Sequence, residues 1–331
     1  MTYQSNFNHY LRFNGRHQKT TTGYAFYYTA SGFSFLVEGS YVKLIFNSYY
    51  EDEAKKAYIV IIYDQQEETH VLELGETIIT LELSKTPSKI QVIKRSESMM
   101  SRSEIVSIET DGVFSYLKEE QPRMKLTFIG DSLTCGYGNL SNDPDLPFST
   151  QYEDGLKSYA SLAASILQVD YEIVAVSGIG LYKSIYANVT MPGIYEQYDI
   201  YDTKPYPFPQ DDDIVILNIG TNDNSYMKFL VEPTREHEMI QFKKSYMNFL
   251  YRIRELHPKA KIIGISQGDR QTYVDPLIEE SIKEIGLTNI YHLRISDVPT
   301  SDGIGQQYHP TVITHQRWSE ELIDFIKQLR K

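Results

Sequence analysis

The pattern of hydrophobic and polar positions changes character near residue 118. Before it, short runs rich in Val, Ile, Phe and Tyr are separated by turn residues, and apolar and polar side chains alternate within several of them. This alternation is typical of strands that bury one face. Strands are expected at residues 23–28, 33–37, 41–46, 58–63, 77–83, 89–94 and 105–109. Strands of this length and spacing predict an all-β sandwich of the jelly-roll type over residues 1–118.

From residue 123 onwards, strand-length apolar runs alternate with helix-length amphipathic segments. The run 213–219 is almost continuously apolar, as a central parallel strand is, and the segment 235–256 repeats apolar residues at spacings of three and four. Further strands are expected at 124–129, 171–176, 261–266 and 290–293, and further helices at 158–167, 276–285 and 315–329. This order predicts a flavodoxin-like α/β/α domain with a parallel sheet over residues 123–331. The polar, proline-containing segment 118–123 marks the seam between the two domains.

Charge and cysteine content narrow the classes of partner. The 331 residues carry a formal net charge of −12 and no dense basic stretch, so neither a nucleic acid nor an anionic membrane is an expected partner. A neutral small molecule or glycan is favoured instead. The single cysteine, Cys135, excludes an intrachain disulfide and a cysteine-based metal site. The chain has no signal-peptide pattern and no apolar run of the roughly 20 residues that span a bilayer, so a cytoplasmic location is expected. Nothing in the sequence indicates the oligomeric state.

Candidate chemistry collects at the ends of the predicted parallel strands, where functional groups gather in such a sheet. Ser132 follows the first strand within Gly-Asp-Ser-Leu, Gly178 and Asn222 follow later strands, and His309 lies between the last strand and the last helix. A hydroxyl nucleophile, N–H donors and an imidazole base are the groups that acyl transfer requires. Each of these residues alone is more often a turn residue or a structural histidine. Only their combination points to catalysis.

In this order, the four residues resemble the pattern of the SGNH (GDSL) hydrolase superfamily, and the likeness extends over residues 123–331. Within that superfamily, the segments that look like carbohydrate esterase family 2 are 132–139, 157–160, 191–192 and 309–315. The segments 12–16 and 94–97 resemble the jelly-roll domain of the same family. The resemblance implies removal of acetyl groups from sugars, often from the 6-hydroxyl of hexoses in plant polysaccharides. The implied substrate is a small acetylated sugar or oligosaccharide.

The same resemblance implies the roles of the site residues. Ser132 would be the nucleophile and His309 the base. The oxyanion would be bound by the N–H groups of Ser132 and Gly178 and by the side chain of Asn222. No metal or organic cofactor is needed for acyl transfer by this route.

The sequence departs from the superfamily pattern just before the histidine. The superfamily places an aspartate three residues before it, whereas this chain has Gln306 there and the equally uncharged Gln307 next to it. Loss of that acid costs about 10⁴ in kcat where a triad depends on it. We therefore predict a Ser–His dyad in which a backbone carbonyl or the Gln307 amide oxygen accepts the Nδ1–H of His309. The alternative acceptor is Asp302, because two glycines that follow it would let its loop fold back.

Four neighbouring residues are expected to have other roles. Asp131 would organise the loop around the nucleophile through local N–H bonds, and Cys135 would pack as a small buried side chain. His315 is the second candidate for the base, but its place at the start of a helix favours a structural role. Tyr308, beside the predicted base, is the ring we expect to stack on a sugar.

Two other functions remain open on the sequence alone. One is a lipid-directed esterase or thioesterase of the same superfamily; the acidic composition and the absence of an amphipathic apolar stretch count against it. The other is a glycan-binding module with a decayed esterase site, which would account for the missing acid. Retention of all four site residues counts against that reading.

Overall fold

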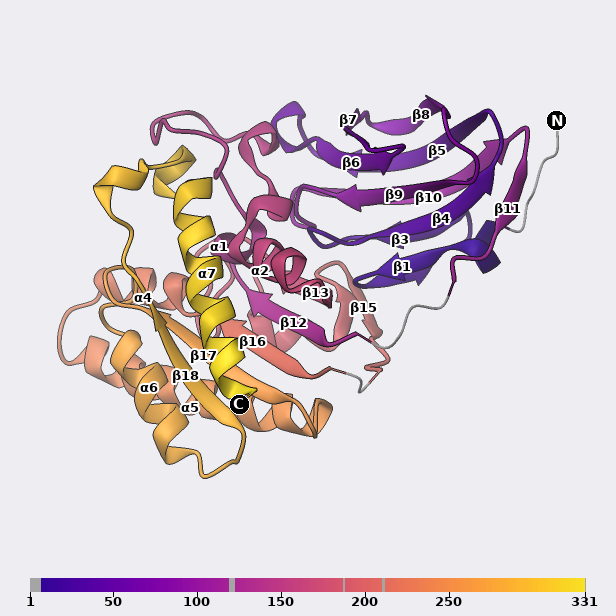
Figure 1. Ribbon diagram of the computed structural model, residues 1–331. Helices are drawn as coiled ribbons and strands as arrows, with labels where there is room; N and C mark the ends of the chain where they lie inside the picture. The colour runs from indigo at the N-terminus through magenta and orange to yellow at the C-terminus, as the bar shows by residue number, and fades with distance from the viewer. Residues whose placement is uncertain (1–6, 119–122, 187, 210–211, 331) are drawn as a thin grey trace.

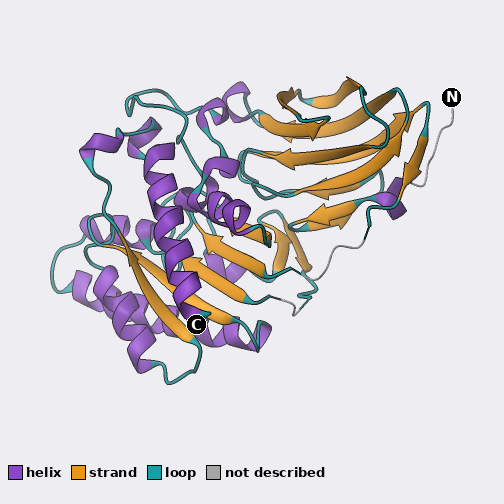
Figure 2. Ribbon diagram, in the orientation of Figure 1, coloured by secondary structure: helices purple, strands orange, loops and turns teal. Residues whose placement is uncertain are grey.

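The computed structural model describes residues 7–118, 123–186, 188–209 and 212–330. Figure 1 shows two parts that lie side by side, an N-terminal part made of strands and a C-terminal part in which helices flank a sheet. The difference in composition is plain in Figure 2, and it confirms the predicted order of an all-β part followed by an α/β/α part. The centre of the predicted seam, residues 119–122, lies outside the described residues.

The N-terminal part consists of two antiparallel sheets. One has the order β1–β4–β9–β6–β7 with β11 paired to β4, and the other has the order β2–β3–β10–β5–β8. The strands are β1 (Arg12–Asn14), β2 (His17–Lys19), β3 (Tyr24–Phe26), β4 (Gly32–Glu38), β5 (Tyr41–Tyr50), β6 (Ala57–Tyr63), β7 (Gln66–Leu72), β8 (Gly75–Glu82), β9 (Ser88–Lys94), β10 (Ser101–Thr110) and β11 (Val113–Ser115). Two 3₁₀ helices, η1 (Phe7–Tyr10) and η2 (Glu53–Lys55), flank them.

One hydrophobic core fills the space between these two sheets. Phe35 on β4, Phe46 on β5 and Ile59 on β6 belong to it, and all three are fully buried. The seven predicted strands are all present. The other four had no apolar run to reveal them, because β1, β2 and β11 have three residues each and β7 is a largely polar edge strand.

The C-terminal part contains a parallel sheet in the order β13–β12–β16–β17–β18. In chain order this is 2-1-3-4-5, which is the flavodoxin-like arrangement that the sequence predicts. The strands are β12 (Lys125–Gly130), β13 (Asp170–Ala175), β16 (Ile214–Asn218), β17 (Lys261–Gln267) and β18 (Ile290–Ile295). The helices are α1 (Ser132–Cys135), α2 (Tyr159–Leu167), α3 (Met191–Ile194), α4 (Thr221–Lys228), α5 (Thr234–Leu256), α6 (Asp275–Glu284) and α7 (Val312–Leu329). A hairpin, β14 (Gln197–Asp199) and β15 (Asp202–Pro205), lies in the long segment before β16.

Helices cover both faces of this sheet. Successive strand residues point to opposite faces, so Ile216 packs with Trp318 of α7 whereas Leu217 packs with Phe242 of α5. Helix α2 joins α7 on the first face, and α6 joins α5 on the second. With both faces covered, the carboxyl ends of the strands are the place where polar groups meet a surface. None of the helices in the described ranges is long and apolar enough to cross a bilayer.

Buried polar contacts join the two parts. The guanidinium of Arg16, which is fully buried, donates to Glu172 Oε1 at 3.1 Å. Arg95 donates to the Gln151 carbonyl at 2.9 Å and lies over the ring of Tyr58. A buried charge is costly unless it is paired or hydrogen-bonded, so these contacts fix how the β part sits against the α/β/α part.

Candidate active site

Ser132 lies at the first turn after β12. Asp131 caps the short helix α1, and its Oδ1 accepts the Leu133 N–H at 3.1 Å. The loop-organising role predicted for Asp131 is therefore seen as a helix cap. The cap places Ser132 at the N-terminus of the helix, where its own N–H has no intrahelical partner. In the described part of the chain, this N–H donates to no other protein group.

His309 reaches Ser132 from the loop between β18 and α7. Its Nε2 lies 2.9 Å from Ser132 Oγ, and its Nδ1 lies 3.0 Å from the backbone carbonyl oxygen of Gln307. A carbonyl is only an acceptor, so Nδ1 carries the proton and donates. Nε2 is then free to accept the proton of the Ser132 hydroxyl, which is the arrangement that a general base requires.

The backbone before His309 is held in an unusual conformation. Gln307 has φ 50° and Tyr308 has φ 63°, and non-glycine residues seldom adopt this left-handed region. Side chains from elsewhere hold this turn: the Tyr137 hydroxyl donates to the Gln307 amide oxygen at 2.7 Å, and Arg270 donates to the Tyr308 carbonyl at 2.9 Å. The turn brings the Gln307 carbonyl to the imidazole. The sequence left open a backbone carbonyl or the Gln307 amide oxygen as the acceptor. The structure uses a backbone carbonyl, that of Gln307, while the Gln307 amide oxygen accepts from Tyr137.

The surroundings of His309 favour its neutral form. Loss of water around the imidazole, followed by the positive charge of Arg270, lowers the pKa of His309 to about 4, despite the hydrogen bond to the Gln307 carbonyl. A base must be unprotonated to act, so the imidazole is ready to accept a proton throughout the neutral range.

This pKa predicts the acid limit of the reaction. We expect kcat/KM to be constant from neutral pH down to about pH 5 and to fall tenfold per pH unit only below pH 4 to 5, because protonation of His309 removes the base. A pH series with a short-chain ester measures it, since kcat/KM reports the free enzyme. An inflection near the usual histidine pKa of about 6.5 would contradict the prediction.

The structure does not place Asp302 against His309. Asp302 Oδ2 accepts a hydrogen bond from Thr314 at 3.0 Å and pairs with Arg317 at 2.6 Å. The alternative in which this carboxylate orients the imidazole is therefore wrong; the loop does fold back, but Asp302 ties it to α7. Gln306 occupies the position of the superfamily aspartate, and its side chain donates to the Pro147 carbonyl.

Asp302→Asn is expected to separate stability from catalysis. The substitution weakens a partly buried ion pair, so it should lower the unfolding temperature, while kcat stays within about threefold of wild type because His309 loses no contact. Calorimetry and initial rates on the same preparation test both parts. Arg317→Met, which removes the other partner of the pair, should behave in the same way. A large loss of kcat in the asparagine variant alone would restore Asp302 as an orienting acid.

Gly178 and Asn222 lie on the wall of the same cavity as Ser132 and His309. Gly178 has φ +75°, and a Cβ there would approach the Cβ of Tyr186 to 2.7 Å, so no other residue fits without a backbone change. Within the described residues, its N–H donates to no protein group. Asn222, on the first turn of α4, donates one amide N–H to the Ile179 carbonyl at 2.8 Å. Among the described residues, its second amide N–H donates to no protein group. The structure thus assembles the three predicted oxyanion donors around one space.

This space is a cavity of about 240 Å³. Its aromatic wall comes from Tyr137, Phe148 and Tyr186, and the Tyr137 ring lies 4.4 Å from the His309 ring between centroids. Tyr186 belongs to the long aromatic segment 182–209, whose sequence is compatible with a binding loop, whereas the sequence did not single out Tyr137 or Phe148 for this place. Lys55, Met99 and Met100 close it from the β part. The site is therefore built by both parts of the chain, which no local motif reveals.

Tyr308 is not among the residues that line this cavity. The residue is 61% exposed, and its hydroxyl donates to Asp145 at 3.0 Å. A contact between Tyr308 and a sugar stays a prediction, and the structure limits it to the surface around the cavity. The rings of Tyr137 and Phe148, which stack on each other at 5.2 Å, lie inside it.

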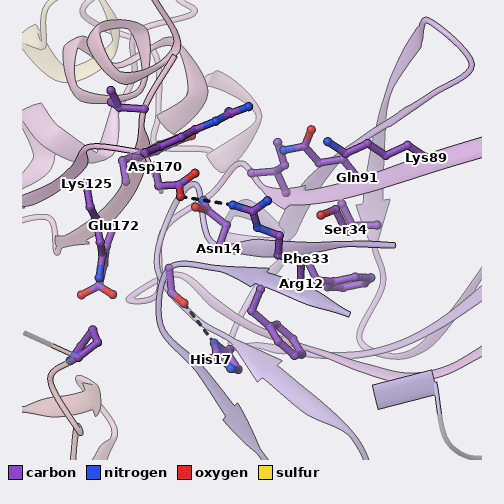
Figure 3. A pocket seen from close by; sticks show the side chains of 18 of the residues that line it. Arg12, Asn14, His17, Phe33, Ser34, Lys89, Gln91, Lys125, Asp170 and Glu172 are labelled. Carbon is purple, nitrogen blue, oxygen red and sulfur yellow. Dashed lines mark hydrogen bonds and ion pairs between the residues drawn. The ribbon is translucent and has the colours of Figure 1, made fainter. Parts of the chain in front are cut away.

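A second, larger cavity of about 540 Å³ lies between the two parts (Figure 3). It is lined by Lys125 and Asp170, the first residues of β12 and β13, and by Arg12 of β1. It therefore lies at the amino ends of the parallel strands, whereas Ser132 and Gly178 lie beyond their carboxyl ends. None of the predicted catalytic residues lines it, so its greater volume does not make it the reaction site.

Two further residues near the site have structural roles. His315 is fully buried, and its Nδ1 accepts the N–H of Tyr159 at the start of α2, as an N-terminal cap does. It is thus engaged away from Ser132, as expected for a structural histidine. Cys135 is fully buried at the end of α1. Among the described residues, no group of three His, Cys, Asp or Glu side chains is arranged to hold a metal ion.

Comparison with known proteins places this geometry in a family. Residues 128–317 match the GDSL-like lipase/acylhydrolase family, and this range is more than half of the chain. The chain belongs to this family, and it is a carboxylic ester hydrolase by class. The matched range contains Ser132, Gly178, Asn222 and His309 together.

Two relatives of similar sequence carry the names of esterases. The chain is 28% identical over 249 residues to the cellulase/esterase CelE of Acetivibrio thermocellus; the match covers 71% of this chain and 29% of CelE, so the likeness concerns less than a third of that enzyme. It is 24% identical over 288 residues to an acetylxylan esterase/glucomannan deacetylase of Cellvibrio japonicus, covering 82% of this chain and 76% of the relative.

Solved structures share the fold over almost the whole chain. A family two carbohydrate esterase from Clostridium thermocellum, in complex with cellohexaose, superposes with a TM-score of 0.85 at 22% identity and covers 97% of this chain and 99% of its own. An acetyl xylan esterase from Butyrivibrio proteoclasticus superposes with a TM-score of 0.86 at 20% identity, with 99% and 98% covered. At these identities the likeness establishes the fold, including the association of an all-β part with the hydrolase domain.

Proposed function

We propose that this chain is a serine carbohydrate O-acetyl esterase that removes acetyl groups from oligosaccharides of the xylan or mannan type. The observation that carries the proposal is the 2.9 Å hydrogen bond between Ser132 Oγ and His309 Nε2 at the wall of the cavity. Support for a sugar ester comes from the relatives, whose names include acetylxylan esterase and glucomannan deacetylase, and from the neighbour solved with cellohexaose. The cytoplasmic location expected from the sequence stays a prediction.

The reaction would proceed through an acyl-enzyme. Ser132 Oγ attacks the acetyl carbonyl carbon while His309 Nε2 takes the hydroxyl proton, and the carbonyl oxygen becomes an oxyanion. The N–H groups of Ser132 and Gly178 and the free amide N–H of Asn222 donate to it. The intermediate then expels the sugar oxygen, to which His309 returns the proton. Water repeats the sequence on the acetyl-serine and releases acetate.

The Gln307 carbonyl replaces the carboxylate of a triad in this scheme. It accepts the Nδ1–H at 3.0 Å and so fixes the ring and the tautomer, as a triad acid does. It carries no full charge to stabilise the imidazolium. The chain would therefore act as a Ser–His dyad, in which the imidazolium of the transition state depends on a dipole alone.

The size of the cavity favours a short acyl group. Its volume of about 240 Å³ is below the range of about 300–1,000 Å³ typical of sites that enclose drug-sized ligands. The methionines and rings of its wall suit a methyl group, and the sugar would remain at the mouth. A long lipid chain would need an apolar channel beyond this space.

The test is acetate release from acetylated xylan, acetylated glucomannan and simple sugar acetates, with NMR assignment of the position lost. The proposal expects release from at least one glycan and none from the Ser132→Ala variant. A parallel comparison of p-nitrophenyl acetate with p-nitrophenyl octanoate should favour the acetate in kcat/KM. Preference for octanoate would indicate a lipid-directed esterase, and no release together with no labelling of Ser132 by a serine-directed phosphonate would indicate a binding module.

A further inference from the structure

The buried carboxylate of Glu97, in the β part, contacts two segments of the proposed active site. Glu97 belongs to the segment that follows β9, and its side chain has no exposed surface. Its Oε2 accepts the N–H of Ser177 at 2.7 Å and the Sγ–H of Cys135 at 3.5 Å. Ser177 immediately precedes the oxyanion donor Gly178. Cys135 is the last residue of α1, the helix that Ser132 begins.

We propose that Glu97 is a positioning residue for the oxyanion hole: its Oε2 holds the Ser177 N–H and the end of α1, and so aims the N–H groups of Gly178 and Ser132 at one point. The inference rests on the proposed esterase function. It assigns to the β part a role in catalysis, in addition to its contribution of Lys55, Met99 and Met100 to the cavity wall.

The contact with Ser177 requires a hydrogen-bond acceptor at the position of Glu97 Oε2. The peptide plane that carries the Ser177 N–H lies one residue before the plane that carries the Gly178 N–H, and Gly178 has no side chain to anchor it. With φ +75°, Gly178 has access to backbone conformations that other residues avoid. A hydrogen bond that fixes the preceding N–H therefore limits the conformational freedom of the Gly178 peptide.

Glu97 is itself held firmly. Its backbone N–H donates to Glu153 Oε1 at 2.6 Å, and its backbone carbonyl accepts from the fully buried Lys94 ammonium at 2.9 Å. Lys94 also donates to the carbonyls of Tyr27 and Ser101, so all three of its protons are used. The backbone N–H and the backbone carbonyl of Glu97 are thus both held by buried partners, so its side chain projects from a fixed position.

The acceptor role does not depend on the charge of Glu97. Burial raises the pKa of the Glu97 carboxyl and that of the neighbouring Glu153, and it lowers the pKa of Lys94 to about 8. Whether ionised or protonated at Oε1, the carboxyl keeps Oε2 as an acceptor for Ser177 and Cys135. Within the described residues, Oε1 has no hydrogen-bond partner. An amide would therefore preserve both contacts.

The test compares Glu97→Leu, which removes the acceptor at similar volume, with Glu97→Gln, which keeps an acceptor oxygen. We expect kcat for a sugar acetate to fall roughly 10- to 100-fold in Glu97→Leu with KM within about twofold, since a small misplacement of catalytic groups has effects of this size. Glu97→Gln should stay within about threefold of wild type. The inhibition constant of a boronic acid, which forms a tetrahedral adduct with the serine, should rise in Glu97→Leu by the factor by which kcat falls.

Thr29→Val is the matched control. It removes a buried hydrogen bond of the same segment, from Thr29 Oγ1 to the Arg95 carbonyl at 2.8 Å, without touching Ser177 or Cys135. Its kcat should equal that of wild type. If Glu97→Leu does not fold, Glu97→Asp withdraws the oxygen from Ser177 and should lose kcat in the same range.

The outcomes separate this inference from the function on which it rests. A wild-type protein that releases no acetate ends the proposed function. An active wild type whose kcat is unchanged in Glu97→Leu or Glu97→Asp overturns the positioning role. Equal losses in Glu97→Gln and Glu97→Leu, or an equal loss in Thr29→Val, overturn it as well, because the effect would then not follow the acceptor.

Discussion

Replacement of Ser132 by alanine is expected to lower kcat for ester hydrolysis by about 10⁴-fold or more, because it removes the attacking oxygen. The change deletes one oxygen atom from a residue that is 7% exposed, so folding should be unaffected. Binding of the substrate should survive, since the rings and the oxyanion donors remain. Initial rates on a sugar acetate, with substrate binding measured by calorimetry, test both halves of this expectation.

Ser161→Ala provides the control for the loss of a buried serine hydroxyl, since Ser161 lies on α2 away from the cavity. It should keep the wild-type rate. Labelling by a serine-directed phosphonate, located by peptide mass, should occur at Ser132 in wild type and in Ser161→Ala and be absent in Ser132→Ala. Residual activity above about one per cent in a preparation free of wild-type enzyme would mean that another nucleophile carries the reaction.

The fold followed from the sequence because its elements repeat simple periods. The strand pattern of 213–219 and the helix pattern of 235–256 appear as β16 (Ile214–Asn218) and α5 (Thr234–Leu256), with no end shifted by more than one residue. What periodicity could not predict is the helix α4 (Thr221–Lys228), which begins directly after a site loop and is mostly polar. Its first turn carries Asn222. The helix lacks the apolar stripe from which the longer helices were predicted, so only its backbone hydrogen bonds in the structure reveal it.

The site was predictable only as far as its own residues carry the chemistry. Ser132, Gly178 and Asn222 follow the ends of parallel strands, which the sheet topology brings together, and His309 reaches them from the loop between β18 and α7. The partner of His309 is a main-chain oxygen. Every residue has a carbonyl, so the sequence does not show which one will accept the Nδ1–H of His309. The direction of that carbonyl depends on the left-handed turn at Gln307, which distant side chains hold. Such long-range contacts are fixed by tertiary packing.

The same reasoning explains why the cavity wall was missed. Lys55, Met99 and Met100 belong to the β part, where alternation of apolar residues predicts strands but says nothing of a neighbouring domain.

A dyad without a carboxylate places more weight on the oxyanion donors, since the imidazolium receives less stabilisation. The donors should therefore dominate the mutational profile after the nucleophile and the base.

Asn222→Ala is accordingly expected to lower kcat by about 10² to 10³-fold with little change in KM, because its free amide N–H would bind the oxyanion only as the charge develops. Asn222→Asp keeps the shape of the side chain and removes both N–H donors, so it should lose at least as much activity and exclude an effect of lost volume. Both variants also lose the 2.8 Å bond to the Ile179 carbonyl, so calorimetry should accompany the kinetics. A rise in KM with kcat preserved would assign Asn222 to substrate binding instead, and the oxyanion would then depend on the two backbone N–H groups alone.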